Sequence, residues 1–186
     1  MIRLLGISGS LRARSFNTAL LHNAVELMPQ GVSLDIKTLH GIPLYDADEE
    51  TAADLPDAVV VLKNAITSAH GVLLATPEYN NGIPGVFKKA IDWASRPAGD
   101  IAHVFGGRPF ALLGASPGGF GTLLAQNAWL PVMRTLGVNL WSGGRMLVSR
   151  SGGAFDEAGK LSDKAIRDQL QAFLAGFTNF IRQQET

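Results

Sequence analysis

The sequence contains no cysteine, and this absence excludes several classes of protein at once. Without a thiol the chain cannot use a cysteine nucleophile, bind zinc through cysteine or form a disulfide. A reducing, cytoplasmic location is consistent with that absence. An excess of one charge is missing as well, because 16 Lys and Arg residues balance 16 Asp and Glu residues. Proteins that bind nucleic acid by neutralising phosphates normally carry a basic surface, so we expect no nucleic-acid partner.

Long apolar runs and several well-known ligand motifs are also absent. No stretch approaches the about 20 apolar residues that a membrane-spanning helix needs, and the apolar segment 2–7 is too short for a signal peptide. Neither Gly-x-x-x-x-Gly-Lys-Ser/Thr nor a strand-to-helix Gly-x-Gly-x-x-Gly is present. The four histidines have no partners at metal-ligand spacing. We therefore expect no membrane partner, no ATPase or Rossmann motif and no metal site.

What is present is a regular alternation of short apolar runs and longer segments of helical periodicity. Near-continuous apolar strands indicate burial on both faces, and therefore a parallel sheet between two helix layers. The predicted fold is an α/β, doubly wound, five-stranded parallel sheet in the order 2-1-3-4-5, and it forms one domain over residues 1–186. The predicted strands are 2–7, 32–36, 72–75, 110–115 and 138–148, and the predicted helices are 15–27, 55–69, 83–95, 120–136 and 162–183. Ser15 and Ser162 are the predicted N-caps of the first and last helices.

The loop that follows the first predicted strand, residues 9–17, is the first candidate ligand site. Open parallel sheets bind ligands at the carboxyl ends of their strands, and free N–H groups at a helix N-terminus suit a phosphate. Ser10, Ser15 and Asn17 could donate hydrogen bonds to phosphate oxygens, and Arg12 could add charge. The alternative is purely structural, with Ser15 as an ordinary helix cap and Arg12 as a solvated surface charge.

A second loop, Thr76 to Gly82, follows the third predicted strand and borders the other side of the expected ligand crevice. Its Pro77-Glu78-Tyr79-Asn80 sequence offers a constrained backbone whose amides suit the edge of a planar ring. Proline and Asn-Gly are also common turn formers, so a merely structural turn is the competing interpretation. A phosphate at one loop and a flat heterocycle at the other predict a mononucleotide cofactor.

The third loop, residues 116–121, follows the fourth predicted strand, and together with Gly114 it forms a Gly-x-Ser-x-Gly pattern around Ser116. That pattern is typical of a hydrolase nucleophile elbow, but an oxyanion hole needs the N–H after the serine and Pro117 has none. All four histidines also precede Ser116, whereas that fold needs a later one. We interpret the loop as a glycine-lined wall that a flat ligand can approach closely.

Together these loops make the chain resemble the NADPH-dependent FMN reductase family of flavodoxin-like fold. The motifs that carry the resemblance are the Gly9-Ser10-Leu11-Arg12 turn with Ser15 and Asn17, the Thr76–Asn80 loop, and the segment Lys89–Trp93. The resemblance implies an FMN phosphate held by the first loop and an isoalloxazine ring bordered by the second and third. The implied cofactor-binding residues are Ser10, Arg12, Ser15, Phe16, Asn17, Pro77, Glu78, Tyr79, Asn80, Ser116 and Gly118.

The resemblance further implies an enzyme that passes electrons from NADPH (or NADH) through FMN to a quinone, an azo compound or a similar small acceptor. One site serving both half-reactions predicts ping-pong kinetics, and no side chain is required as a catalytic acid or base. The segment 122–129 lacks the arginine and tyrosine pattern that some relatives use in tetramers, so we expect a homodimer rather than a tetramer. Two alternatives remain: a flavodoxin-like electron carrier without NADPH turnover, and a binding module that has lost the cofactor.

Overall fold

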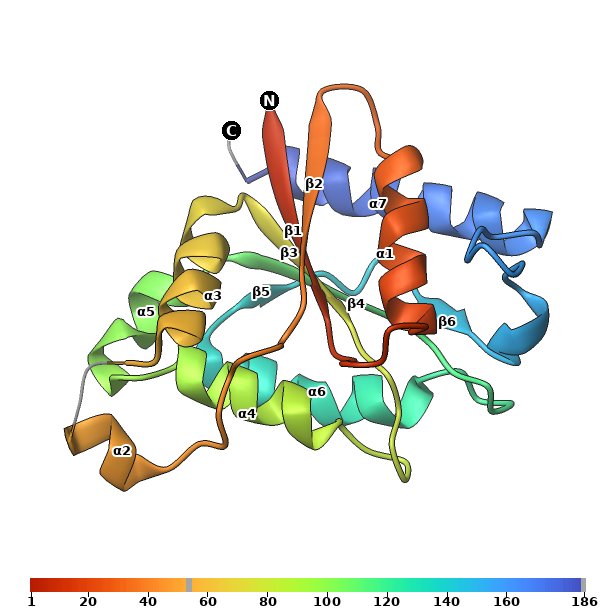
Figure 1. Cartoon of the computed structure of the whole chain (residues 1–186). Helices are drawn as coiled ribbons and strands as arrows, with labels where there is room; N and C mark the ends of the chain where they lie inside the picture. The colour runs from red at the N-terminus through yellow and green to blue at the C-terminus, as the bar shows by residue number, and fades with distance from the viewer. Residues whose placement is uncertain (53–54, 185–186) are drawn as a thin grey trace.

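The computed structural model describes residues 1–52 and 55–184, so the remaining residues of the predicted domain lie outside the described part of the chain. A parallel sheet runs through the centre (Figure 1). Its strands follow the order β2-β1-β3-β4-β5, and β6 pairs with β4 as well. This order confirms the predicted doubly wound topology. The strands are β1 (Ile2–Ser8), β2 (Val32–Lys37), β3 (Gly71–Ala75), β4 (Pro109–Ala115), β5 (Asn139–Leu140) and β6 (Met146–Val148).

The prediction of one continuous fifth strand over 138–148 is wrong, because two short strands take its place. Strand β5 pairs with the start of β4, and β6 pairs with its end. Between them Trp141 packs its ring against Phe173, with the ring centroids 5.0 Å apart. A Cβ on Gly144 would lie 2.7 Å from the Trp141 ring. The Trp141 N–H still donates to the Phe110 carbonyl oxygen at 2.8 Å, so the chain leaves the sheet after Trp141, over residues 142–145, and β6 then resumes the pairing with β4.

Seven α-helices surround the sheet in the described part of the chain. They are α1 (Phe16–Glu26), α2 (Ala47–Ala52), α3 (Asp57–Ser68), α4 (Gly85–Ala94), α5 (Ile101–Val104), α6 (Leu123–Leu136) and α7 (Lys164–Arg182). Five of them correspond to the predicted helices, whereas α2 and α5 are too short to have shown a clear helical period. The cap of α7 is Asp163, whose carboxylate accepts hydrogen bonds from two backbone N–H groups, and not the Ser162 of the predicted boundary.

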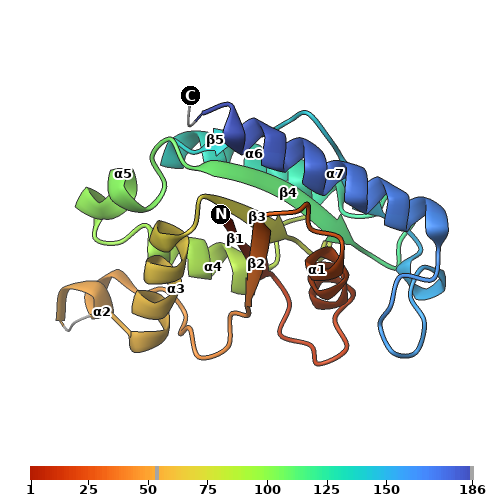
Figure 2. The same cartoon turned by 90° about the horizontal axis from the view of Figure 1, so that it is seen from above.

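Strand residues alternate between two apolar cores, one on each face of the sheet. Helices α1 and α7 pack on one face, and helices α3, α4 and α6 pack on the other. In Figure 2, the labels of α1 and α7 lie at the right of the view, and those of α3 and α4 lie at the left. In β1, Leu4 belongs to the first core and Leu5 to the second, so both faces of the strand are buried. Burial on both faces explains why the strands are apolar throughout.

The tryptophans belong to these cores. Trp93 and Trp129 are fully buried in the core beneath α3, α4 and α6, and Trp141 packs at the edge of the other core. The Trp129 indole N–H donates to the Thr76 hydroxyl at 3.1 Å, which ties α6 to the end of β3. Over the described residues, none of the helices has the length and apolar character needed to cross a membrane.

Candidate functional site

The loops that follow β1, β3 and β4 meet around a small depression of about 50 Å³. Arg12 from the first loop and Tyr79 from the second both line it, although they lie far apart in the sequence. Of the residues predicted for the site, only Asn80 and Gly118 do not line the depression. Its full lining is Ser10, Arg12, Ser15, Phe16, Asn17, Pro77, Glu78, Tyr79, Ala115, Ser116 and Pro117.

Three serine hydroxyls at the depression share one hydrogen-bonding pattern. Ser10 Oγ accepts from the Arg12 N–H at 3.3 Å, and Ser15 Oγ accepts from the Thr18 N–H at 3.2 Å. Ser116 Oγ accepts from the Gly118 N–H at 3.2 Å. In each serine the hydroxyl oxygen accepts the backbone hydrogen bond through a lone pair. The hydroxyl proton has no hydrogen-bond acceptor among the described residues. A hydroxyl has one proton to donate, so all three can donate to the oxygen atoms of a ligand.

The N-terminus of α1 points free donors at the same place. Ser15 caps the helix, as predicted from the sequence, and its side chain accepts a hydrogen bond from the N–H of Thr18, the third helical residue. The N–H groups of Phe16 and Asn17 belong to the first turn and have no partner within the helix. These N–H groups and the positive end of the helix dipole favour an anion at this position.

The side chain of Asn17 is committed to the protein itself. Its Nδ2 donates to the carbonyl oxygen of Ala115 at 2.9 Å, and its Oδ1 accepts from the N–H of Ala115 at 2.9 Å. Both bonds are buried, and they join residues that are 98 positions apart. This pairing holds the start of α1 against the end of β4, so Asn17 faces the depression with its backbone N–H as a free donor.

Glu78 also holds two loops together. Its Oε2 accepts from the N–H groups of Leu124 and Ala125 at 2.8 and 3.0 Å, and so caps the N-terminus of α6. The carboxylate is stabilised there by the helix dipole. No acceptor in the described part of the chain takes the Glu78 N–H, whereas Tyr79 donates its own N–H to Gly82. At this loop Glu78 therefore offers its backbone, rather than its carboxylate, to a ligand.

The tip of the second loop is a two-residue hairpin. Tyr79 and Gly82 exchange both backbone hydrogen bonds, and Asn80 and Asn81 have φ values of 49° and 62°. Positive φ at both central residues is the geometry of a type I′ turn, in which asparagine is favoured. Asn80 lies at this exposed tip, and the Tyr79 side chain is 45% exposed beside it. The turn presents Tyr79 at the rim of the depression.

The third loop is held by a segment that the sequence did not reveal as part of the site. The Arg150 N–H donates to the Gly118 carbonyl, and the Ser151 N–H donates to the Ser116 carbonyl. Arg150 has a φ of 47°, in the left-handed region. No sequence signal near residue 150 predicts this contact, because it depends on β6 pairing beside β4.

Two glycines allow the loops to approach so closely. A Cβ at Gly9 would lie 2.1 Å from Cδ1 of Phe87 and 2.8 Å from Cδ of Pro77. A Cβ at Gly114 would lie 2.3 Å from the carbonyl oxygen of Thr76. Phe87 is fully buried and packs edge-on against Trp129, so it cannot yield to a larger residue. The first and second loops meet only because glycine occupies position 9.

The first loop carries two arginines, of which only Arg12 lines the depression. Arg12 and Arg14 are exposed, and neither guanidinium has a hydrogen-bond or ion-pair partner among the described residues. Across those same residues, no group of three or more Asp, Glu or His side chains could hold a metal ion. The arrangement offers a phosphate hydroxyl donors, backbone N–H groups and unpaired positive charge.

Comparisons with known proteins agree with this geometry. A family model described as NADPH-dependent FMN reductase matches residues 2–152. The chain is 41% identical to NAD(P)H-dependent FMN reductase PA1204 of Pseudomonas aeruginosa, over 98% of this chain and 96% of that protein. It is 36% identical to 2-hydroxy-1,4-benzoquinone reductase of a Burkholderia species, over 98% of each chain. The solved structure of FerB, a flavoenzyme NAD(P)H:(acceptor) oxidoreductase from Paracoccus denitrificans, superposes with a TM-score of 0.87 at 31% identity, over 98% of each chain.

Proposed function

Because this chain belongs to the NADPH-dependent FMN reductase family, we propose that it holds FMN at the depression and transfers electrons from NAD(P)H to a small acceptor such as a quinone. The observation that carries this proposal is the convergence of three loops on one small depression lined with free donors. The proposal assigns the phosphate to the first loop and the flavin ring to the second and third.

The phosphate end of FMN fits the donors at α1. Ser10 and Ser15 would donate their hydroxyl protons, and Phe16 and Asn17 their backbone N–H groups. Arg12 would supply a charge-assisted hydrogen bond to the same phosphate. The depression of about 50 Å³ is several times the about 10–15 Å³ of such space that one water needs, so it has room for a small polar group at these donors.

The flavin ring does not fit inside the depression and would lie across its rim. Pro77, Glu78, Tyr79 and Asn80 would border one edge of the ring, and the Ser116–Gly118 loop would border another. The Glu78 N–H is free to stabilise negative charge on the ring. This placement would leave the ring accessible from solvent to both the nicotinamide and the acceptor.

The chemistry that FMN supplies when bound is acceptance of a hydride from the nicotinamide and delivery of two electrons to the acceptor. One open face serves both substrates in turn, which predicts ping-pong kinetics. The chain's own residues bind and orient the reactants. The carboxylate of Glu78 is engaged in capping α6, and we assign no side chain at the rim the role of an acid or base.

Anaerobic reduction of the FMN-loaded protein by NADPH tests this proposal directly. We expect the yellow flavin absorbance to bleach on addition of NADPH and to return on addition of a quinone. A plot of reciprocal rates at several quinone concentrations should give parallel lines, as for a ping-pong mechanism. Flavin that binds tightly but keeps its colour would favour an electron carrier without NADPH turnover. Failure of the protein to retain or rebind FMN would favour a binding module without a cofactor.

We further propose a homodimer in the cytoplasm. Exposed apolar side chains next to the third loop support association, because Phe120 is 72% exposed and Leu124 is 38% exposed. Sedimentation of the protein at several concentrations measures the assembly. A monomer or a tetramer across the whole range would contradict the proposed dimer.

A further inference from the structure

A second and larger cavity adjoins the depression on the other side of the first loop. It has a volume of about 590 Å³ and lies between α1 and the segment 152–160. Arg12, Ser15 and Phe16 line both this groove and the depression, so the two spaces share a wall. A ligand at the flavin ring could therefore continue past the phosphate into the groove. Nothing in the proposed FMN site uses this space.

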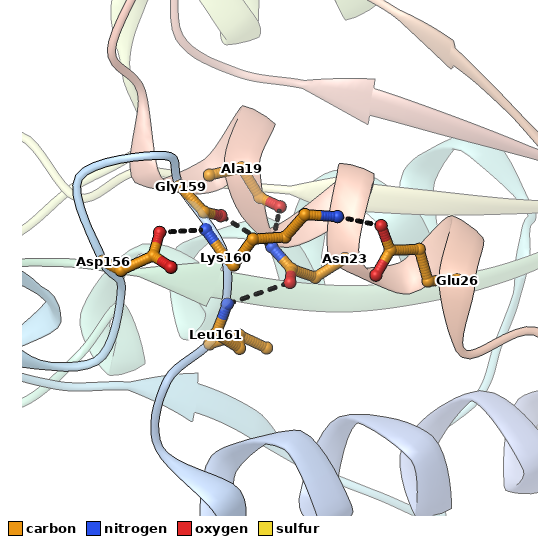
Figure 3. Close-up of polar contacts among 7 residues, drawn as sticks. All are labelled: Ala19, Asn23, Glu26, Asp156, Gly159, Lys160 and Leu161. Carbon is orange, nitrogen blue, oxygen red and sulfur yellow. Dashed lines mark hydrogen bonds and ion pairs between the residues drawn. The ribbon is translucent and has the colours of Figure 1, made fainter.

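The outer wall of the groove is fixed to α1 by a buried asparagine. Asn23 donates to the carbonyl oxygens of Ala19 and Gly159, each at 2.8 Å, and accepts from the Leu161 N–H at 2.9 Å. Figure 3 shows these bonds beside an ion pair between Lys160 and Glu26. The wall is thus ordered before any ligand arrives, and an ordered wall lowers the entropic cost of binding.

An aromatic surface lies at the inner end of the groove. Phe16 and Phe155 line the groove, and their rings stack with centroids 5.6 Å apart and an interplanar angle of 27°. Phe155 is almost completely buried, whereas Phe16 is half-buried. Phe155 thus supports the Phe16 ring, a planar base can pack against the exposed part of Phe16, and the small side chains of Ala13, Ala19 and Ala158 leave room beside it.

The charges around the groove are divided between its two walls. Arg14 and His22 lie on the first loop and α1, and the guanidinium of Arg14 has no partner among the described residues. Asp156 and Glu157 belong to the opposite segment, where Asp156 accepts from the Lys160 N–H at 2.9 Å. Lys160 pairs with Glu26. Once Arg12 is engaged by FMN, Arg14 is the remaining unpaired cation of the groove.

We propose that this groove binds the adenosine half of NADPH, with the base against Phe16 and the 2′-phosphate against Arg14. The inference rests on the proposed function, because it places the nicotinamide at the flavin ring. The chain has no dinucleotide-binding turn of its own, so the far end of the co-substrate needs another surface. The groove begins where FMN ends and offers a base-stacking surface and one free cation. Arg14 is the residue that distinguishes NADPH from NADH.

Binding of 2′,5′-ADP to the FMN-loaded protein tests the inference without any flavin reduction. We expect 2′,5′-ADP to bind more tightly than 5′-AMP by isothermal titration calorimetry. Arg14→Ala should weaken the binding of 2′,5′-ADP about tenfold or more, as for a lost hydrogen bond to a charged group. It should change the affinity for 5′-AMP less than about twofold. In steady-state assays the same substitution should raise KM for NADPH by a similar factor. It should leave kcat with NADPH unchanged, and both kcat and KM with NADH unchanged.

Two further variants make the result specific. Arg14→Lys should recover part of the affinity for 2′,5′-ADP, because it restores the charge without the forked geometry. Arg134→Ala removes an exposed arginine on α6 and should change neither ligand. Equal binding of 2′,5′-ADP to wild type and Arg14→Ala would overturn the inference, even if NADPH bleaches the flavin. A flavin that NADPH cannot bleach would overturn the proposed function, and the calorimetric comparison would still decide whether Arg14 binds a 2′-phosphate.

Discussion

Among the described residues, charged side chains are paired in one polar cluster at α3 and unpaired in the first loop of the depression. In that cluster, formed by Tyr45, Glu50, Lys63, Arg96 and Asp100, opposite charges lie together. Lys63 lies 2.6 Å from Asp100, the Tyr45 hydroxyl donates to Glu50 at 2.8 Å, and the Arg96 guanidinium lies 4.0 Å from Glu50. Arg12 at the depression and Arg14 at the adjoining groove have no partner within the described residues.

This difference separates charges that serve the fold from charges that are free for a ligand. A partly buried cation such as Lys63 needs a partner, because leaving water without one is costly. The loop arginines remain in water and bear no such cost, so they keep their full charge for an incoming anion. At the depression, the polar side chains of Asn17 and Glu78 bind backbone groups of neighbouring segments. Hydrogen bonds therefore hold the backbone of the loops in place, whereas the arginines of the first loop have no charged partner in the described part of the chain.

Asn17→Ala should produce the largest change, because it removes two buried hydrogen bonds at the site. The N–H and carbonyl oxygen of Ala115 would lose their partners, and each unsatisfied buried group costs about 1–3 kcal/mol. We expect the free energy of unfolding to fall by about 3 kcal/mol and FMN binding to weaken as α1 loosens from β4. Urea unfolding and FMN titration measure the two effects. Asn127→Ala, which changes an exposed asparagine in α6, is the matched control. Equal losses of stability and FMN affinity in both variants would show that Asn17 does not hold α1 against β4.

The role of Asn17 illustrates what the sequence could and could not predict. The convergence of the loops follows from parallel topology, because the carboxyl ends of β1, β3 and β4 lie at one edge of the sheet. The Ser15 cap depends only on neighbours in the chain, and its prediction is confirmed. The pairing of Asn17 with Ala115 joins residues 98 positions apart, and no local pattern specifies it. The division of the fifth strand likewise depends on where Trp141 packs.

Ser15→Ala should have a smaller effect on stability but a clear effect on the cofactor. Loss of the cap costs about 1 kcal/mol of helix stability. Loss of the hydroxyl proton removes a hydrogen bond to a charged group, worth about 1.5–3 kcal/mol of FMN affinity. Ser15→Thr keeps the hydroxyl and should retain most of both. Fluorescence titration with FMN measures the affinity, and an unchanged dissociation constant in Ser15→Ala would remove Ser15 from the site.

Asp100→Asn should have the smallest effect, and that effect should be confined to stability. The hydrogen bond and charge of Lys63 hold the pKa of Asp100 below its ordinary value of about 3.9. A carboxyl group with a lowered pKa stabilises the fold above its ordinary pKa, and this contribution disappears as the pH falls through the lowered value. Stability of the wild type should thus decline more steeply below about pH 4 than that of Asp100→Asn. Asp35→Asn, an exposed carboxyl on β2, should preserve the wild-type decline. Because the cluster lies away from the depression, all three proteins should bind FMN equally, and weakened FMN binding in Asp100→Asn would show that the two regions are coupled.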